Sequence, residues 1–293
     1  MASIFIADSM NHRLVVLDSD TLAYISTFGS LGSGNDEFNQ PNALVCDDTF
    51  LYIYDYGNGR LVKRNALDLS YVDQTAIGFL DSGICSIGTD GINLYIGDPN
   101  NSRVIKLLCS DLSVVSFITD GFITPVNVTI DDTYLYSYDF DNGAFMKHLL
   151  ADSSFVTSLN YSPTPGVLGG FVTNNTENNV YTVRGDNTNN YVQKRLKSDF
   201  SFISEYGSSD QTELYSPRGI TYDGTYLYVI NLLSGGKGYL SKIQASDMSF
   251  IADAGTPSIA GLAVDLSYPQ GIAFFSSPIP PAIIVNTFGN IIW

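Results

Sequence analysis

Basic residues are scarce in this sequence. Only 14 Lys and Arg stand against 30 Asp and Glu, so the 293-residue chain has a formal net charge of −16. An acidic surface of this kind repels phosphate backbones unless the bases cluster. The densest basic group is only Lys194, Arg195 and Lys197. The composition therefore predicts no nucleic-acid partner and favours a surface whose charge keeps the protein soluble.

Histidine and cysteine are scarcer still. The two histidines, His12 and His148, fall in different parts of the repeat pattern described below, so they cannot share one metal. Two of the three cysteines, Cys46 and Cys85, fall near opposite ends of neighbouring strands, too far apart for a disulfide, and are expected to be free thiols. No Cys-x-x-Cys, His-Glu-x-x-His, phosphate-loop or Gly-x-Ser-x-Gly pattern occurs. The sequence thus predicts no catalytic residue, no metal site and no cofactor.

Long apolar runs are missing as well. No stretch is long enough to cross a membrane, so membrane insertion is not expected. The first six residues carry no basic segment and already read as a strand, which predicts that there is no signal peptide. We therefore expect the protein in the cytoplasm, or assembled into a virion or another particle.

What the sequence does contain is a repeat. A strand with the pattern Leu-Tyr-x-x-Asp recurs, each time followed by a tight turn and a returning strand. Its copies, some of them degenerate, begin at residues 4, 51, 94, 135, 180 and 227, in steps of 41 to 47 residues. A second pattern, Asp-x-Ser followed by two apolar residues, keeps the same step and begins at residues 68, 111, 152, 199 and 247.

A period in the low forties with about four strands per unit is typical of a β-propeller. The copies predict an all-β, six-bladed propeller of about four antiparallel strands per blade, forming one domain over residues 1–281. Because the chain begins with a second-strand copy, we expect residues 270–275 to supply the missing inner strand of the first blade. This pairing of N-terminal and C-terminal strands leaves no open edge. Residues 282–293 then have no place in the ring, and we predict an extra hairpin that packs outside the propeller or on a partner subunit.

Two segments resemble a known family. Residues 6–18 read Ile-Ala-Asp-Ser-Met-Asn-His-Arg-Leu-Val-Val-Leu-Asp, which resembles the signature that names NHL repeats. The Gly-rich segment 32–41, with Phe38 and Pro41, is similar to the loop that joins one NHL blade to the next. The match is close over residues 1–70, partial at 94–118 and 214–231, and weakest at 160–190. The resemblance implies a six-bladed propeller. An NHL-like amidating lyase depends on histidine-bound zinc, and those ligands have no counterparts here.

An acid and a base recur across the tight turns of the first three blades. They are five residues apart, which places a carboxylate beside a guanidinium where a turn leaves backbone groups unpaired. The pairs are Asp8 and Arg13, Asp55 and Arg60, and Asp98 and Arg103. The fourth blade has Asp139 but Ala144, so the pairing is not obligatory. We interpret these residues as scaffold rather than as a site.

The blade-joining loops and the turns between second and third strands share one face, called here the top face. Its turns carry apolar residues where polar ones are usual. Either these side chains form an exposed contact patch or each folds over its neighbouring blade. Residues that follow the strand-opening prolines, Val126 among them and with Cys85 in the matching position, should ring the mouth of the central channel, and this mixed ring lacks the carboxylates that Ca²⁺ requires. The predicted binding residues are Met10, Tyr56, Phe140 and Leu232 in the turns, and Asn42, Asn127, Arg218 and Gln270 at the mouth.

Three functions remain open. The first is a non-catalytic scaffold that binds a protein partner through the top-face loops, which the lack of catalytic groups favours. The second is a glycan- or receptor-binding component of a phage tail or surface assembly, because 19 tyrosines and many Asn and Asp residues suit stacking on sugars. The third is a metal-dependent lactonase- or lyase-type enzyme. Asn127 and Arg218 would line its mouth, but an acidic partner for them is not evident.

Overall fold

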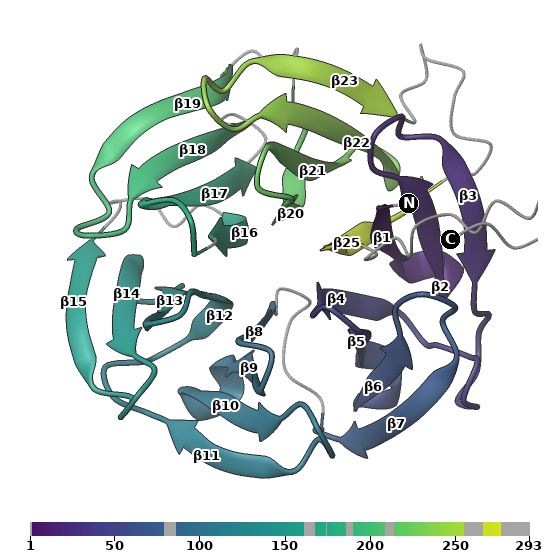
Figure 1. The fold of residues 1–293 in the computed structure, drawn as a ribbon, viewed down its shortest axis with the longest axis horizontal. Coiled ribbons are helices and arrows are strands. Elements are labelled where there is room, and N and C mark those ends of the chain that lie inside the picture. Colours follow the sequence, from purple (N-terminus) through teal and green to yellow (C-terminus); the bar gives the residue numbers. More distant parts are fainter. Residues whose placement is uncertain are drawn as a thin grey trace, which may run out of the picture.

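The computed structural model describes residues 2–78, 86–160, 168–173, 175–185, 190–208, 214–254 and 266–276. Over these residues the chain forms six antiparallel sheets arranged as a ring around a central axis (Figure 1). Each sheet is one blade of four strands, and the sixth carries an additional short strand. The all-β, six-bladed propeller predicted from the repeat is confirmed. No helix among the described residues is long and apolar enough to span a membrane.

The strands of each blade are given from the inside outward. Blade 1 contains β25 (Pro269–Phe275), β1 (Ser3–Asp8), β2 (Arg13–Asp18) and β3 (Tyr24–Phe28). Blade 2 contains β4 (Pro41–Cys46), β5 (Phe50–Asp55), β6 (Arg60–Asn65) and β7 (Tyr71–Ala76). Blade 3 contains β8 (Ile87–Thr89), β9 (Asn93–Asp98), β10 (Arg103–Leu108) and β11 (Val114–Ile118). Blade 4 contains β12 (Pro125–Ile130), β13 (Tyr134–Asp139), β14 (Ala144–Leu149) and β15 (Phe155–Asn160). Blade 5 contains β16 (Leu168–Thr173), β17 (Asn179–Gly185), β18 (Asn190–Leu196) and β19 (Phe202–Ser208). Blade 6 contains β20 (Pro217–Tyr222), β21 (Tyr226–Leu232), β22 (Lys237–Gln244) and β23 (Phe250–Ala254), and β24 (Leu266–Ser267) pairs with β22.

The ring closes by the pairing that the sequence predicts. Strand β25 runs antiparallel to β1, with Ser3 opposite Phe275 and Ile6 opposite Ile272. Figure 1 shows β25, from the end of the described chain, lying beside β1 from its beginning. The inner edge of β1 is therefore covered by the last described strand. The predicted hairpin at 282–293 lies outside the described residues and stays a prediction.

The hydrophobic core consists of wedges between neighbouring blades. One cluster packs Phe5 and Val16 of blade 1 against Leu51 and Val62 of blade 2. The next packs residues of blade 2 against blade 3, and further clusters continue round the ring to the contact between blades 6 and 1. Strand residues that alternate between the two faces of a blade thus feed two different clusters. The position of every blade depends on both of its neighbours.

The Asp-x-Ser turns between third and fourth strands have one geometry in five blades. The acid accepts the backbone N–H of the Ser two residues on, as in the 2.9 Å contact between Asp68 and Ser70. The residue between them adopts a positive φ, 58° at Leu69 and 59° at Phe200, and its side chain is buried in four of the five turns and half-buried at Ser153. The Asp cap and the buried side chain offset the cost of this left-handed conformation.

These turns predict acid sensitivity. Hydrogen bonds from the Ser hydroxyl and backbone lower the pKa of five exposed carboxyls below the ordinary value of 3.8; they belong to Asp68, Asp111, Asp152, Asp199 and Asp247. A carboxyl whose pKa is lower in the folded chain contributes stability above pH 3.8, and the contribution is lost as the pH falls through the folded-state pKa. We expect the urea midpoint to fall between pH 5 and pH 3, and to fall less in a variant with all five changed to Asn. Equal losses in the two proteins would refute this origin.

Candidate functional site

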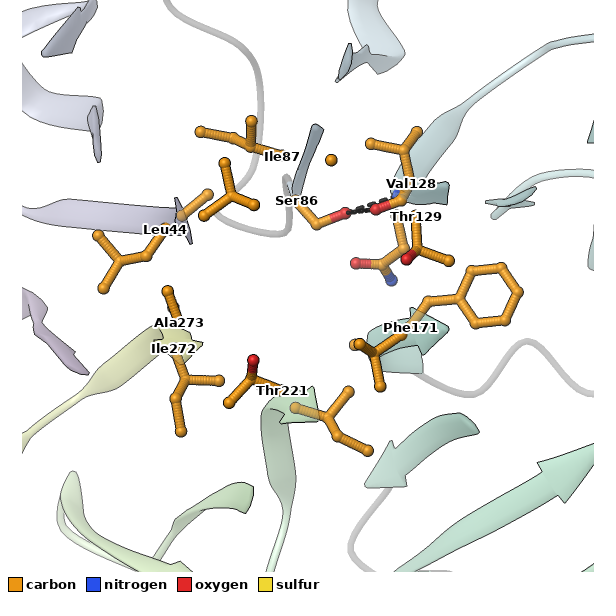
Figure 2. Close-up of a pocket in the computed structure, with 18 of the residues that line it drawn as sticks. Leu44, Ser86, Ile87, Val128, Thr129, Phe171, Thr221, Ile272 and Ala273 are labelled. Atoms are coloured by element: carbon orange, nitrogen blue, oxygen red, sulfur yellow. Dashed lines mark hydrogen bonds between the residues drawn. The ribbon is translucent and has the colours of Figure 1, made fainter. Parts of the chain in front are cut away.

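A cavity of about 240 Å³ occupies the centre of the ring and is lined by the inner strands of all six blades. Figure 2 shows Leu44, Ile87, Val128, Phe171 and Ile272 around this channel. They share one level, because each pairs with the middle of its blade's second strand. With Ile220 of blade 6, six apolar residues form a complete ring at this level.

Along each inner strand, the position two residues before the apolar ring is closer to the top face. We call this level of the channel the mouth, and polar side chains line part of it. Asn42, Arg218 and Gln270 line it from three consecutive blades, 2, 6 and 1. The sequence predicted these residues there, together with Asn127, which also lines the channel one position further along β12. Val126, at the level of the mouth in blade 4, is 6% exposed and packs among aromatic side chains. Cys85, predicted for the same ring, lies outside the described residues.

Two glycines hold the mouth residues close together. A Cβ on Gly219 would lie 2.6 Å from the carbonyl oxygen of Gln270, and one on Gly271 would lie 2.2 Å from that of Asn42. No side chain fits such an approach, so glycine lets each inner strand touch the next. The sequence reasoning missed this role, although Pro217-Arg218-Gly219 and Pro269-Gln270-Gly271 are visible as a repeated Pro-x-Gly pattern.

Arg218 has no hydrogen-bond or ionic partner among the described residues. Its Nε is buried without an acceptor, and burial alone lowers the pKa of the guanidinium. No Asp or Glu is present among the described residues that line the channel. The mouth therefore holds a positive charge that no described lining residue compensates, in a chain with 30 acidic residues.

Ser86 is a second lining residue that the sequence did not single out. Its hydroxyl accepts the N–H of Val128 at 2.6 Å and donates to the carbonyl oxygen of the same residue at 3.0 Å (Figure 2). The side chain thus satisfies backbone groups on the inner edge of blade 4, which no strand pairs. Ser86 lies directly before β8, so this contact links the inner strands of blades 3 and 4. Arg218 is in blade 6, on the other side of the channel.

The predicted apolar patch on the turns of the top face is smaller than expected. Met10 is exposed at 47%, while Tyr56 and Phe140 are half-buried against the core clusters of their blades. Leu232 is only 9% exposed, because β21 runs one residue further than the matching strands of blades 1 to 4 and turns this side chain inward. The expectation of an exposed Leu232 was therefore wrong. For that residue the alternative holds, in which the side chain folds into the protein.

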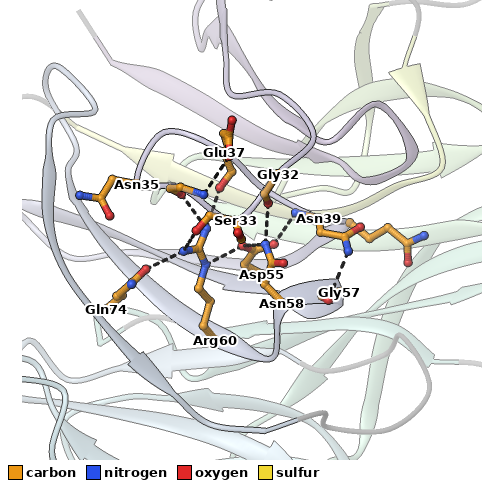
Figure 3. Close-up of polar contacts among 12 residues, drawn as sticks. Gly32, Ser33, Asn35, Glu37, Asn39, Asp55, Gly57, Asn58, Arg60 and Gln74 are labelled. Atoms are coloured by element: carbon orange, nitrogen blue, oxygen red, sulfur yellow. Dashed lines mark hydrogen bonds and ion pairs between the residues drawn. The ribbon is translucent and has the colours of Figure 1, made fainter.

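The acid–base pairs of the hairpins are fully used in structural contacts. Asp55 accepts hydrogen bonds from Arg60 Nε at 2.8 Å, Asn58 Nδ2 at 2.7 Å and the backbone of Asn39 at 2.7 Å. Arg60 also donates to carbonyl oxygens of the loop that joins blades 1 and 2 (Figure 3). The contact to the blade-joining loop recurs at the seam, where Asp8 accepts the N–H of Ser267 at 2.6 Å. These contacts agree with the interpretation of the pairs as scaffold.

Acidic turns between first and second strands, which lie on the face opposite the top face, here called the bottom face, are also structural. Asp47 accepts two backbone N–H groups of its own turn and the hydroxyl of Tyr52, whose pKa burial raises far above the ordinary value. Lys63 crosses to the next blade and donates to the carbonyl oxygen of Cys109 at 2.6 Å. Equivalent lysines, Lys147, Lys194 and Lys242, bind the bottom turn of the following blade in the same way. The clefts between blades on this face are lined by groups that hold the ring together.

The histidines are likewise engaged. His12 accepts the N–H of Gln40 through Nδ1 at 3.1 Å. His148 is fully buried, and Nε2 lies 2.8 Å from the carbonyl oxygen of Asp120. Burial lowers the pKa of His148, so its ring is neutral at pH 7. The described part of the chain contains no cluster of three or more His, Cys, Asp or Glu residues placed to hold a metal ion.

Comparison with solved structures finds the same architecture elsewhere. A chain in the crystal structure of a nidogen/laminin complex superposes with a TM-score of 0.71 and 12% sequence identity, covering 94% of this chain and 99% of that one. A protein of unknown function from Bacteroides caccae superposes with a TM-score of 0.64 and 11% identity, covering 94% of this chain and 98% of that one. No protein family and no curated protein matches the sequence.

At these identities the likeness establishes the fold alone. The site therefore rests on geometry. Of the eight residues predicted from the sequence, the structure brings Asn42, Asn127, Arg218 and Gln270 together in the channel. It leaves Met10 exposed on a turn of the top face, half-buries Tyr56 and Phe140, and buries Leu232. The candidate site is thus the channel mouth, with the top-face turns around it.

Proposed function

We propose that this propeller is a non-catalytic scaffold that binds a protein partner with its top face. The observation that carries the proposal is the contrast between polar groups that the fold already uses and groups that remain available on the top face. Asp47, Asp55 and His148, which are residue types common in active sites, form hydrogen bonds with other groups of the fold. On the top face Arg218 has no ionic partner among the described residues, and Met10 is exposed.

The fold comparison supports the same proposal. One similar chain belongs to a nidogen/laminin complex, which is an assembly of proteins. We further infer that the blades are divergent NHL repeats. In support of this, Asn11, Asn58 and Asn101 each donate to the strand-ending Asp of a hairpin, in the pattern Asp-x-x-Asn-x-Arg. A propeller enzyme with an acidic metal site would need carboxylates at the channel, and the described lining offers none.

Glycan binding has weaker support. Tyrosines that would stack on sugars need exposed rings, but many of the 19 lie in the interior. Seven of them are 2% exposed or less: Tyr52, Tyr54, Tyr95, Tyr136, Tyr138, Tyr181 and Tyr228. Their hydroxyls mostly bind turn carboxylates, as Tyr95 binds Asp90 at 3.0 Å. We therefore rank the protein-binding role first.

Changing Met10, Tyr56 and Phe140 together to Ser is expected to abolish partner binding. The three side chains supply apolar contact area on the top-face turns, and loss of central apolar contacts typically costs an interface several kcal/mol, of order 2 or more. Folding should survive, because an exposed residue such as Met10 contributes about 0.5 kcal/mol or less and a half-buried ring about 1–2 kcal/mol. Affinity capture from an extract of the native source, followed by mass spectrometry, measures the result.

The matched control removes apolar surface elsewhere. Val72, Val115 and Phe155 are 42–49% exposed on the outer strands, and changing them to Thr keeps strand propensity. A partner captured by the wild type and by this control, but lost from the top-face variant, supports the proposal. A partner lost only from the control would move the contact surface to the circumference of the propeller.

A further inference from the structure

We propose that the central channel binds an aliphatic carboxylate, with the charged group at Arg218 in the mouth and the aliphatic group in the apolar ring below it. The inference deepens the proposed function, because the mouth lies on the top face, but its observations are those of the channel alone. The carboxylate belongs either to a free small acid or to the C-terminal residue of a protein partner. Both present the same chemistry to the channel.

The charge in the mouth is the first observation. An isolated cation is costly to bury, and buried guanidinium groups are normally paired. Other buried arginines have partners among the described residues: Arg60 pairs with Asp55, Arg64 contacts Asp36, and Arg195 donates to Gln193 and to the carbonyl oxygen of Phe200. Among the described residues Arg218 has no such partner: its Nε is buried without an acceptor, and burial lowers the pKa of the guanidinium. A bound anion would supply the missing partner, and a planar carboxylate matches the guanidinium in a two-point contact.

The neighbouring amides are the second observation. Gln270 and Asn42 follow Arg218 round the mouth, and neither side chain hydrogen-bonds a described residue within the channel. The close approaches at Gly219 and Gly271 fix the spacing of these three residues. Amide N–H groups on one side of a guanidinium add donors for the two oxygens of a carboxylate. No described acidic residue of the lining competes for them.

The apolar ring below the mouth is the third observation, because it offers contacts for the aliphatic part of the ligand. Its members are 1–7% exposed and come from all six blades: Leu44, Ile87, Val128, Phe171, Ile220 and Ile272. Small-molecule sites are usually apolar pockets with a few placed polar groups. Inorganic phosphate would satisfy the guanidinium but leave this ring unfilled, whereas an aliphatic acid uses both parts.

The test titrates the full-length protein with hexanoate by isothermal calorimetry and ligand-observed NMR. Saturable binding is expected, with hexanamide and acetate each binding at least about ten-fold more weakly. Hexanamide keeps the shape and loses the charge, and a hydrogen bond to a charged group typically accounts for a ten- to hundred-fold difference. Acetate keeps the charge and lacks four methylene groups, each contributing roughly four-fold. Inorganic phosphate should bind no more tightly than acetate.

Two variants locate the site. Arg218→Met should weaken hexanoate binding about ten- to hundred-fold, whereas Lys237→Met, which removes an exposed charge from the same face, should leave it unchanged. If Arg218→Met does not fold, Gln270→Leu replaces it, and the hexanoate–hexanamide comparison on the wild type needs no variant. Equal binding of hexanoate and hexanamide, equal binding by Arg218→Met, or no binding at all overturns the inference.

A peptide arm separates the two sources. Acetyl-Gly-Gly-Leu with a free carboxylate is compared with its C-terminal amide. Hexanoate binding without peptide binding assigns the channel to a small acid, and binding of the free peptide but not of the amide assigns it to a protein C-terminus. None of these measurements involves a partner captured by the top-face turns. If hexanoate does not bind, the proposed protein-binding function is unaffected. If no partner is captured, the result of the hexanoate titration is likewise unaffected.

Discussion

Truncation after residue 268 is expected to abolish cooperative folding, because it removes β25 (Pro269–Phe275), the inner strand of blade 1. Ile272 and Phe275 are 6% and 5% exposed and belong to the two core clusters on either side of that blade. Removing one such side chain typically costs about 2–5 kcal/mol. The truncation removes several together with the hydrogen bonds to β1, which exceeds the 5–15 kcal/mol that usually separates folded from unfolded domains.

Deletion of residues 282–293 is the matched control. That segment was predicted to lie outside the ring, so the shorter truncation should keep the propeller folded while weakening any assembly that depends on it. Urea denaturation followed by circular dichroism separates the two: a cooperative transition is expected without 282–293 and none without 269–293. A cooperative, wild-type-like transition in the longer truncation would show that the ring does not need its terminal strand. Loss of folding in the shorter one would place 282–293 in the closing blade.

Replacing Asp55 by Ala is expected to destabilise the protein by about 3–5 kcal/mol, the range seen when one partner of a buried ion pair is removed. The carboxylate is fully buried, and the Arg60 side chain that it binds is 9% exposed. Without Asp55 the guanidinium keeps its contacts to the loop but loses its counter-charge, and the N–H of Asn39 loses its acceptor. Urea denaturation of the variant and of the wild type measures the difference.

Asp139 provides the comparison for this prediction. It occupies the same position in blade 4 and accepts backbone N–H groups of the blade-joining loop, but Ala144 stands where Arg60 would be. Asp139→Ala should therefore cost less than Asp55→Ala, and the difference reports the unpaired guanidinium. If the double change of Asp55 and Arg60 to Ala were no less harmful than the sum of the single changes, the two side chains would not be coupled.

The repeat in the sequence determined the architecture. Leu-Tyr-x-x-Asp fixes a strand with alternating faces, a buried acid at its end and a tight turn after it, and these features need only local chemistry. The step of 41 to 47 residues is long enough for four strands per blade. The first copy, at residue 4, has no inner strand before it, and this predicted that the last described strand, β25, closes the first blade. Placing Asn42, Arg218 and Gln270 at the channel followed from the same periodicity.

Which side chains remain available there was decided only by the tertiary structure. Leu232 looked like an exposed turn residue, but one additional strand residue turned it inward. Asp47, Asp55 and His148 look reactive as a list of residue types, yet each meets a partner from another segment of the fold. Asp47 meets Tyr52 of β5, while Asp55 and His148 meet backbone groups of blade-joining loops. Arg218 looks ordinary in the sequence. In the fold, inner strands of different blades partly bury it, and no described residue of the lining supplies an anion. Periodicity is a property of neighbours along the chain, whereas pairing of charges depends on distances that exist only once the ring has closed.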